Sequence, residues 1–220
     1  MLSGGAGKRG MERAFAELFG VPEAFSNFDF QGKVDPAIFR EALRLYGVRP
    51  ADENQAVRDL IALYERYVAE EMPRATNAAL MPGVRPLLEK LHGRPNVSLG
   101  LLTGNVLGGA KAKLGHFDLW RFFPYGAFGS DDEDRAALVP IALARASAIH
   151  GFAIAPGPNV YVIGDTDRDI ACAKANACTA VGVATLGFSV EQLQSHGADI
   201  VFRDFSNTAQ VLKDLGVNDE

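Results

Sequence analysis

Three acidic residues follow one apolar segment of the chain directly. The segment 159–163 is typical of a buried strand, and Gly164 leads from it into Asp165, Asp167 and Asp169. Carboxylate oxygens at such a point suit a hard divalent cation such as Mg²⁺, which takes few carboxylates and keeps several waters. Acids are also favourable in the first turn of a helix for structural reasons alone. The motif therefore becomes informative only together with a second one.

That second motif is Thr103-Gly104-Asn105, which ends an apolar segment expected to form a strand over 97–102. A helix is expected over about 108–114, directly after this motif. A hydroxyl and backbone N–H groups beside a glycine, next to a helix N-terminus, are suited to hold phosphate oxygens. Since the two motifs end two strands of one predicted sheet, together they predict a metal-assisted phosphoryl site.

Residues 81–220 alternate between strand and helix patterns. Strands are expected over 97–102, 125–128, 159–163, 179–184 and 199–202, and helices over 84–91, 108–114, 135–150, 167–175, 190–196 and 207–215. Alternation of this length predicts an α/β fold with a parallel, doubly wound sheet covered on both faces. Ligands of such sheets bind beyond the carboxyl ends of the strands, where both motifs fall.

Residues 12–80 show apolar residues at helical spacing, interrupted by glycine and proline at three turns. The expected organisation is a loop or linker over 1–11, an all-helical domain over 12–80, and the α/β core over 81–220.

Composition narrows the class of protein. The chain has 220 residues, 48% of them hydrophobic, a net charge of -5 and a pI near 5.4, which does not favour nucleic-acid binding. Cys172 and Cys178 match no redox or zinc spacing and are expected to be buried apolar residues. No apolar window is long enough for a membrane span, and the first residues lack the apolar core of a signal peptide. The expectation is a reduced, cytoplasmic protein without a membrane partner.

The motifs Leu101–Asn105 and Val162–Ile170, with Arg135 at a helix start between them, resemble the haloacid dehalogenase-like (HAD) hydrolase superfamily. The likeness is to the phosphoglycolate-phosphatase-like branch, which has a Rossmann-like core and a helical cap. Gly164-Asp165-x-x-x-Asp169 is the most specific part.

The resemblance implies roles for individual residues. Thr103 would hydrogen-bond the transferring phosphoryl group, and Asn105 would support it. Asp165 would coordinate Mg²⁺, and Asp169 would hold either the coordination shell or the basic residue in place. The family usually has lysine as that basic residue. Arg135 is the first candidate for this role, and the alternative is an exposed helix residue paired with Asp131 or Glu133. Lys113 is the second candidate.

One expected part is missing from the sequence. The resemblance implies an aspartate nucleophile in an Asp-x-Asp-Gly-Thr-like motif on a central first strand, between the strands at 97–102 and 159–163. The 220 residues contain no such motif, and Met1–Gly7 is similar to the loop that follows it. The central first strand is therefore expected to be missing, which leaves its two neighbours without a ladder partner. Either these neighbours close up, or another segment fills the gap, or the natural protein begins further upstream.

The expected function is that of a Mg²⁺-dependent phosphoric monoester hydrolase acting on a small phosphorylated metabolite, with little or no turnover by these residues alone. The alternative from another class is a non-catalytic protein that binds phosphate and a cation. Carbon–halogen hydrolysis is less favoured, because relatives with that chemistry do not keep the Gly-Asp-x-x-x-Asp pair.

Overall fold

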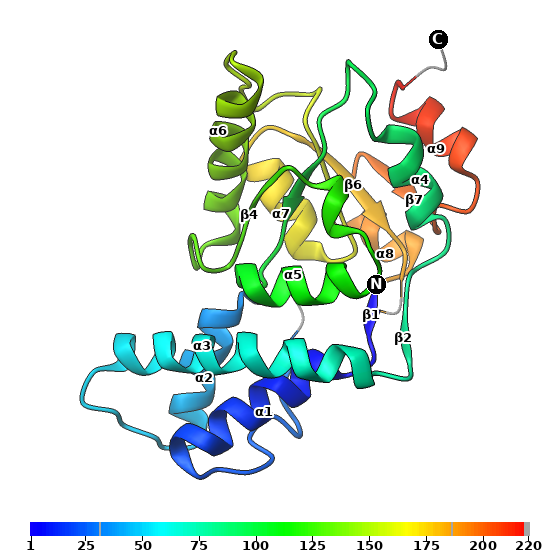
Figure 1. The fold of residues 1–220 in the computed structure, drawn as a ribbon. Coiled ribbons are helices and arrows are strands. Elements are labelled where there is room, and N and C mark those ends of the chain that lie inside the picture. The colour runs from blue at the N-terminus through cyan, green and yellow to red at the C-terminus, as the bar shows by residue number, and fades with distance from the viewer. Residues whose placement is uncertain (31, 186, 218–220) are drawn as a thin grey trace. The chain divides into compact units, whose positions relative to one another are not determined.

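Figure 1 shows the computed structural model, which describes residues 1–30, 32–185 and 187–217. The described residues form a mixed α/β fold with parallel strands, which confirms the predicted fold class. They group into two compact units. Unit 1 comprises residues 1–79, 103–120 and 128–133, and unit 2 comprises residues 80–102, 121–127 and 134–220. That residues 12–80 form the helical cap that the resemblance implies, and residues 81–220 the core, stays a prediction.

Unit 1 is mainly helical. Its helices are α1 (Ala6–Phe19), α2 (Asp35–Leu45), α3 (Glu53–Glu71) and α5 (Leu107–His116), with a short 3₁₀ helix η1 (Met72–Arg74). The strands β1 (Leu2–Ser3) and β2 (Ala78–Ala79) pair in antiparallel register, Leu2 opposite Ala79. An N-cap defines the start of α3, because the Asp52 side chain accepts a hydrogen bond of 3.0 Å from the Gln55 N–H.

The first helix begins earlier than the sequence predicts. A loop was expected over 1–11, whereas α1 begins at Ala6, after Gly4 and Gly5 with φ of +56° and +79°. The glycines inside α1 allow close packing. A Cβ on Gly10 would lie 3.1 Å from the Val68 backbone nitrogen, so the backbones of α1 and α3 approach each other there. The glycine-rich segment thus serves helix packing, and the loop prediction was wrong for residues 6–11.

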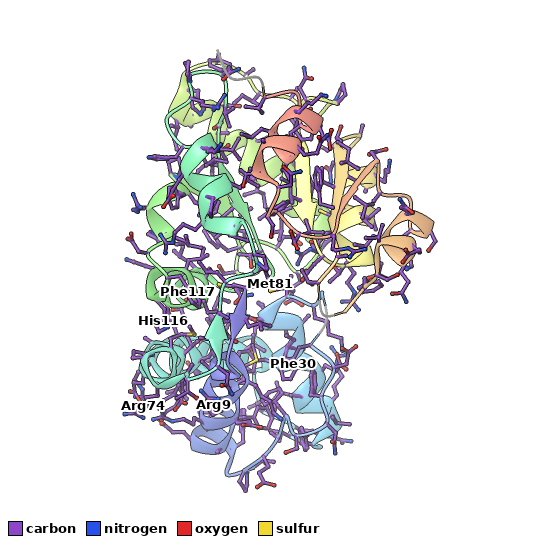
Figure 2. All side chains as sticks on the ribbon, turned by 90° about the vertical axis from the view of Figure 1, so that its right-hand side faces the viewer. Arg9, Phe30, Arg74, Met81, His116 and Phe117 are labelled. Carbon is purple, nitrogen blue, oxygen red and sulfur yellow. The ribbon has the colours of Figure 1, made fainter. Side chains whose placement is uncertain are left out.

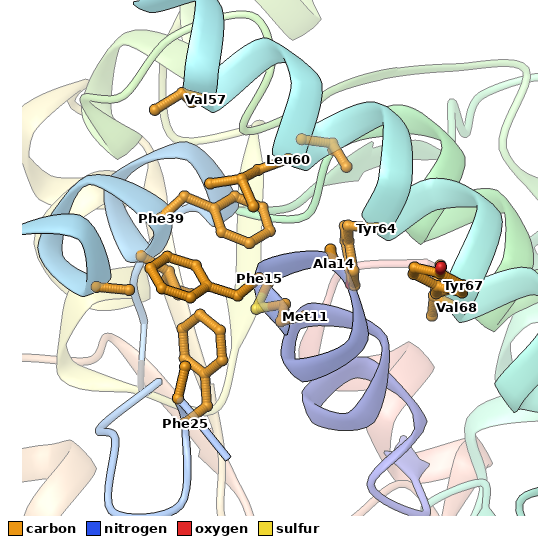
Figure 3. Packing of buried hydrophobic residues seen from close by; sticks show 14 of the residues in the cluster. Met11, Ala14, Phe15, Phe25, Phe39, Val57, Leu60, Tyr64, Tyr67 and Val68 are labelled. Carbon is orange, nitrogen blue, oxygen red and sulfur yellow. The ribbon is translucent and has the colours of Figure 1, made fainter. Parts of the chain in front are cut away.

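Aromatic side chains dominate the core of unit 1, shown in Figure 3. Phe15, Phe25, Phe39 and Tyr64 are fully buried. The ring centroids of Phe15 and Phe25 lie 5.8 Å apart, and those of Phe39 and Tyr64 lie 6.0 Å apart, both edge to face. Such pairs contribute roughly 0.5–1.5 kcal/mol each beyond the burial of their area. This core therefore fixes α3, which carries Tyr64, against α1 and α2.

Ion pairs add to the packing of α1 on α3. Arg9, labelled in Figure 2, donates to Glu71 at 2.7 Å, and Arg13 donates to the other oxygen of Glu71 at 2.9 Å. These two bonds hold the pKa of Glu71 below its usual value. The buried face of α1 and this pair of bonds set the position of Gly7. Gly7 lines a cavity within unit 1 that is described below.

Unit 2 contains two parallel ladders. Strand β3 (Gly100–Leu102) pairs with β4 (Tyr125–Ala127), and β6 (Thr179–Val183) lies between β5 (Tyr161–Gly164) and β7 (Ile200–Phe202). The helices of this unit are α4 (Val84–Leu91), η3 (Arg135–Ala137), α6 (Leu138–His150), α7 (Asp167–Ala175), α8 (Val190–Ser195) and α9 (Thr208–Asp214). The short 3₁₀ helix η2 (Trp120–Phe122) lies where the chain passes between the two ranges.

Both faces of the strand β6 are covered. Val181 and Val183 pack in a cluster with Leu87 of α4 and Leu212 of α9. Ala180, the residue before Val181, packs in a second cluster with helices α6, α7 and α8. Because neighbouring residues of a strand point to opposite faces, this is the doubly wound arrangement that the sequence predicts.

The two ladders do not join among the described residues. Strand β3 pairs with β4 alone and β5 with β6 alone, so these two neighbours of the expected first strand have not closed up. On β5 the side chains of Tyr161 and Ile163 are 37% and 41% exposed, although the segment was expected to be buried. That a central first strand is missing between β3 and β5 stays a prediction.

Within the described part of the chain, no helix combines the length and the apolar composition that a membrane crossing requires.

Candidate functional site

The acidic motif lies at the carboxyl end of β5, where α7 begins. Thr166 is the N-cap of α7, and its hydroxyl accepts from the Asp169 N–H at 3.3 Å. The Asp169 carboxylate in turn accepts from the Thr166 N–H at 3.1 Å, which completes a capping box. The strand-to-helix turn is thus rigid, and it presents Asp165 one residue after the strand ends.

Asp169 is buried and its carboxylate is surrounded by donors. One oxygen, Oδ2, accepts from the N–H groups of Asp165 and Thr166, both at 3.1 Å, and from the Thr166 hydroxyl at 2.7 Å. The other oxygen, Oδ1, accepts from Arg135 Nε at 3.1 Å and Nη2 at 2.5 Å. Asp169 in this arrangement positions the turn and the guanidinium. Direct coordination of a metal by Asp169 stays a prediction.

Arg135 is therefore an internal partner of the acidic motif. It lies in the 3₁₀ turn η3, where Asp134 caps the turn by accepting from the Ala136 N–H. Its contact with Asp169 leaves Nη1 without a hydrogen bond among the described residues. A guanidinium held by two of its nitrogens offers the rest of its fork to an anion.

Asp165 differs from Asp169 in being exposed. Its Oδ2 accepts a hydrogen bond of 2.8 Å from the Thr185 hydroxyl. Among the residues that the structure describes, no group of three or more histidine, cysteine or acidic side chains is placed to hold a metal ion. A Mg²⁺ ion is often held by only one or two carboxylates together with waters and substrate phosphates, so a single free carboxylate fits it.

The Thr103–Asn105 loop belongs to unit 1, and its backbone is used internally. The Thr103 hydroxyl accepts from the Asn105 N–H at 3.2 Å, and Asp35 Oδ2 accepts from the Val106 N–H at 2.8 Å. That backbone N–H groups of this loop hold phosphate stays a prediction. The N–H groups of Asn105 and Val106 already donate to acceptors within the protein. Gly129 fixes the loop from the other side by donating its N–H to the Asn105 carbonyl at 2.9 Å.

A cavity of about 270 Å³ lies beside this loop within unit 1. Its lining combines backbone of the glycine-rich N-terminal segment with charged and aromatic side chains. The lining residues are Ser3, Gly5, Gly7, Lys8, Met11, Phe30, Lys33, Asp35, Ile38, Tyr64, Asn105 and Lys113. Three of them are lysines and one is an aspartate, so the cavity carries a net positive charge when all four are ionised. It is suited to a small anion.

The polar groups of the cavity influence one another. Lys113 donates a short hydrogen bond to Asn105 Oδ1. Burial lowers the pKa of Lys113, and the negative charge of Asp35 opposes this effect. Burial also raises the pKa of Asp35 to about 6, although Lys113 and the bond from Val106 both lower it. The hydroxyl of Tyr64 is buried without a hydrogen-bond partner among the described residues, and burial raises its pKa well above the usual value.

The structure thus brings the predicted site residues together in two groups, one in each unit. Asp165, Asp169 and Arg135 meet in unit 2, and Thr103 and Asn105 meet in unit 1. Their catalytic and metal-binding roles stay predictions. Lys113, the second candidate for the basic role, contacts Asn105.

Sequence reasoning missed Asp35 and Thr185. Thr185 follows the end of β6, and a polar residue after a strand end is a usable signal. Asp35 precedes proline at a helix start, which indicates a cap and gives no sign of a contact 71 residues away.

Comparison with known proteins identifies the family. Residues 51–176, more than half of the chain, match the model of the haloacid dehalogenase-like hydrolases. The chain therefore belongs to this family of hydrolases, which confirms the resemblance seen in the sequence.

Two relatives are similar in sequence over about three quarters of this chain. A phosphoglycolate phosphatase of Salmonella typhimurium is 29% identical over 171 residues, which are 76% of this chain and 65% of that protein. One from Shigella boydii serotype 4 is 29% identical over 164 residues, which are 74% of this chain and 61% of that protein. The chain thus spans less than two thirds of the length of these relatives.

Solved structures support the fold. A hydrolase from Pseudomonas syringae aligns with a TM-score of 0.65 at 20% identity, over 96% of this chain and 92% of that one. A predicted phosphoglycolate phosphatase from Haemophilus somnus aligns with the same TM-score at 17% identity, over 95% and 91% of the two chains. At such identities the likeness is one of fold alone.

Proposed function

We propose that the protein hydrolyses phosphoric monoesters of a small metabolite, with a substrate similar to phosphoglycolate and with Mg²⁺ as cofactor. Membership of the HAD-like hydrolase family and the phosphoglycolate phosphatases among its relatives support this proposal. In the reaction the bond between phosphorus and the ester oxygen breaks, the alcohol leaves with a proton, and the oxygen of water ends on phosphorus. A cytoplasmic location stays a prediction.

The observation that carries the proposal is the contrast between Asp165 and Asp169. Asp169 is buried, and both of its oxygens accept hydrogen bonds from the protein. Asp165 is exposed at the end of β5, with the Thr185 hydroxyl as its hydrogen-bond donor. An exposed carboxylate that accepts a single hydrogen bond and is held at a capped turn is a suitable ligand for a cation. When bound there, Mg²⁺ would neutralise charge on a phosphoryl oxygen.

Further residues of the proposed site supply hydrogen-bond donors. The Thr103 hydroxyl accepts from the Asn105 N–H, so its own proton is free for a phosphoryl oxygen. Arg135 Nη1 and the Asn105 amide are donors of the same kind. Donors held in place before the reaction stabilise charge that develops during phosphoryl transfer. That Thr103 and Asp165 serve one phosphoryl group stays a prediction.

Turnover by residues 1–220 alone is expected to be low. The 220 residues contain no Asp-x-Asp-Gly-Thr-like segment to supply the attacking carboxylate that the family resemblance implies. The residues of this chain support binding of Mg²⁺. A direct test should therefore measure Mg²⁺ binding.

The test compares two neighbouring acids by titration calorimetry with MgCl₂. In Asp165→Asn we expect Mg²⁺ affinity to fall about tenfold or more, because a neutral amide replaces the one free carboxylate. Asp167→Asn is the matched control. Asp167 lies two residues after Asp165, in the first turn of α7, and accepts from the Arg168 N–H at 2.9 Å, so its loss should leave Mg²⁺ affinity nearly unchanged.

Equal affinity in the wild type and Asp165→Asn would refute the assigned cation site. A second assay separates an enzyme from a non-catalytic binding protein. It measures release of phosphate from phosphoglycolate and from phosphate esters of neutral alcohols, with and without Mg²⁺. Binding with no turnover, in this chain and in one extended by a native Asp-x-Asp strand, would instead favour a non-catalytic phosphate-binding protein.

A further inference from the structure

The orientation of the Asn105 amide is determined by its neighbour. Lys113 on α5 donates to Asn105 Oδ1, and both residues line the cavity of unit 1. A charged lysine has only donors, and an amide has its acceptor on one side and its donors on the other. The Nδ2 hydrogens of Asn105 must therefore point away from Lys113. Within the described part of the chain neither N–H has a partner, so both are available to another acceptor.

Asp35 holds the backbone on both sides of Asn105. Its buried carboxylate accepts from the Val106 N–H, and its own N–H donates to the Gly104 carbonyl at 2.8 Å. Two hydrogen bonds therefore tie the first residue of α2 to the backbone on both sides of Asn105. The same carboxylate provides the negative charge that favours the charged form of Lys113, against the effect of burial.

The space for Lys113 is provided by a glycine. A Cβ on Gly7 of α1 would lie 3.1 Å from Lys113 Nζ, closer than most such contacts. The ammonium thus fits against the backbone of α1 because no side chain stands there. Lys113 is held in one place by α1 on one side and by Asn105 on the other.

We propose that Asp35, Lys113 and Asn105 act together in the cavity of unit 1 as positioning and binding residues: Asp35 supplies the opposite charge in the cavity that Lys113 also lines, Lys113 fixes the Asn105 amide, and Asn105 donates to an anionic oxygen of the ligand. This inference deepens the proposed function and rests on it for the identity of the ligand, a phosphoryl group. Asp35 and Lys113 are positioning residues, because they act through Asn105.

The charged groups around Asp35 come from several elements. Glu65 and Tyr64 belong to α3, Lys113 to α5, and Lys8 to α1. Lys33 precedes α2 in the chain and lines the same cavity. Glu65 raises the pKa of Asp35 and Lys113 lowers it. The relevant titration is that of Lys113, since its loss of a proton at alkaline pH would release the orientation of the Asn105 amide.

The first measurement follows the side-chain amide of Asn105 by ¹⁵N–¹H NMR, assigned from the peak pair that disappears in Asn105→Asp. In the wild type these resonances should shift with pH as Lys113 titrates. In Asp35→Asn the midpoint should move to lower pH, because an opposite charge no longer favours the ammonium. In Lys113→Met the alkaline shift should be absent. A purely structural role of Asp35 would leave the midpoint where it is.

The second measurement is the affinity for inorganic phosphate, by calorimetry. Lys113→Met should weaken it about tenfold, the size expected for loss of one well-placed donor to a charged group. Lys111→Met is the matched control, since Lys111 is exposed on the same helix and should leave affinity unchanged.

The outcomes separate this inference from the proposed function. If the Asn105 resonances behave as expected but phosphate does not bind the wild type, the positioning stands and the phosphatase proposal fails. If phosphate binds and the resonances are insensitive to Lys113→Met, the inference is overturned. Should Asp35→Asn fail to fold, Lys113→Met decides alone, because the alkaline shift either disappears in it or persists.

Discussion

Carboxylates in this protein differ in role because their surroundings differ. Asp165, Asp169 and Asp35 are chemically equal in the sequence. In the structure Asp169 is surrounded by five donor groups, Asp165 is exposed, and Asp35 is buried with one hydrogen bond to its carboxylate. Burial without full hydrogen bonding favours the protonated form of an acid. Asp35 is therefore the acid whose charge depends most on its environment.

A stability prediction follows for Asp35. Its pKa is raised from 3.8 to about 6 by burial, so the folded protein binds more protons than the unfolded chain between these values. Stability from this group is therefore present at low pH and is lost as pH rises through about 6. The wild type should gain up to about 3 kcal/mol relative to Asp35→Asn between pH 7 and pH 4, at ~1.4 kcal/mol per pKa unit.

Urea denaturation of both proteins at several pH values measures this difference. The difference between the two proteins isolates the group, because all other acids titrate in both. A difference that stays constant from pH 4 to pH 7, or grows with rising pH, would contradict the raised pKa.

At the scale of single elements, β5 shows how a strand can be buried on one face only. Val162 is 7% exposed and packs with α6 and α7, whereas its neighbour Ile163 is 41% exposed. Alternation places these two side chains on opposite faces. The sequence of this strand is apolar throughout, which is typical of burial on both faces. The apolar sequence of the strand therefore did not predict that Ile163 is exposed.

The two neighbours allow a matched comparison. Val162→Ala should destabilise the protein by about 1.5–3 kcal/mol, because buried methyl groups are lost and a cavity remains. Ile163→Ala should cost less than about 1 kcal/mol, as for a side chain that is largely in water. Chemical denaturation of the two variants measures both values. A larger loss in Ile163→Ala would show that this face of β5 is covered in solution.

At the scale of the whole molecule, the fold is organised around several separate cores. Unit 1 has one cluster, with aromatic rings at its centre, and unit 2 has two clusters that share the strand β6. Leu212 of α9 belongs to one cluster of unit 2 and Ile170 of α7 to the other. The sheet separates these two side chains, so they have no packing partner in common.

This separation predicts additive effects on stability. Leu212→Ala should cost about 2–5 kcal/mol and Ile170→Val about 0.5–1.5 kcal/mol, since both residues are 2% exposed. In the double variant the two losses should add within about 0.5 kcal/mol. Denaturation of the wild type, both single variants and the double variant completes the cycle. A coupling above about 1 kcal/mol would mean that the two faces of the sheet are not independent.

The order and type of most elements were predictable from the sequence, because they depend on local patterns. The helices α4 and α7 have the bounds that the sequence predicts, since each has clear start signals and a short apolar stripe. The strand–helix alternation and the polar residues at strand ends are also local, and they are sufficient to indicate the family. Strand ends were less accurate: β3 begins at Gly100 and not at Val97.

Only the tertiary structure decided how the site residues are paired. The contacts of Arg135 with Asp169 and of Asp35 with Val106 join residues 34 and 71 positions apart, and no local pattern encodes a partner at such a distance. The same holds for the charge of Asp35 and Lys113, because burial sets a pKa and burial is a property of the packed chain. The sequence thus determined which chemical groups lie at the strand ends. Packing determined which of these groups hold other side chains in place and which are exposed to bind a ligand.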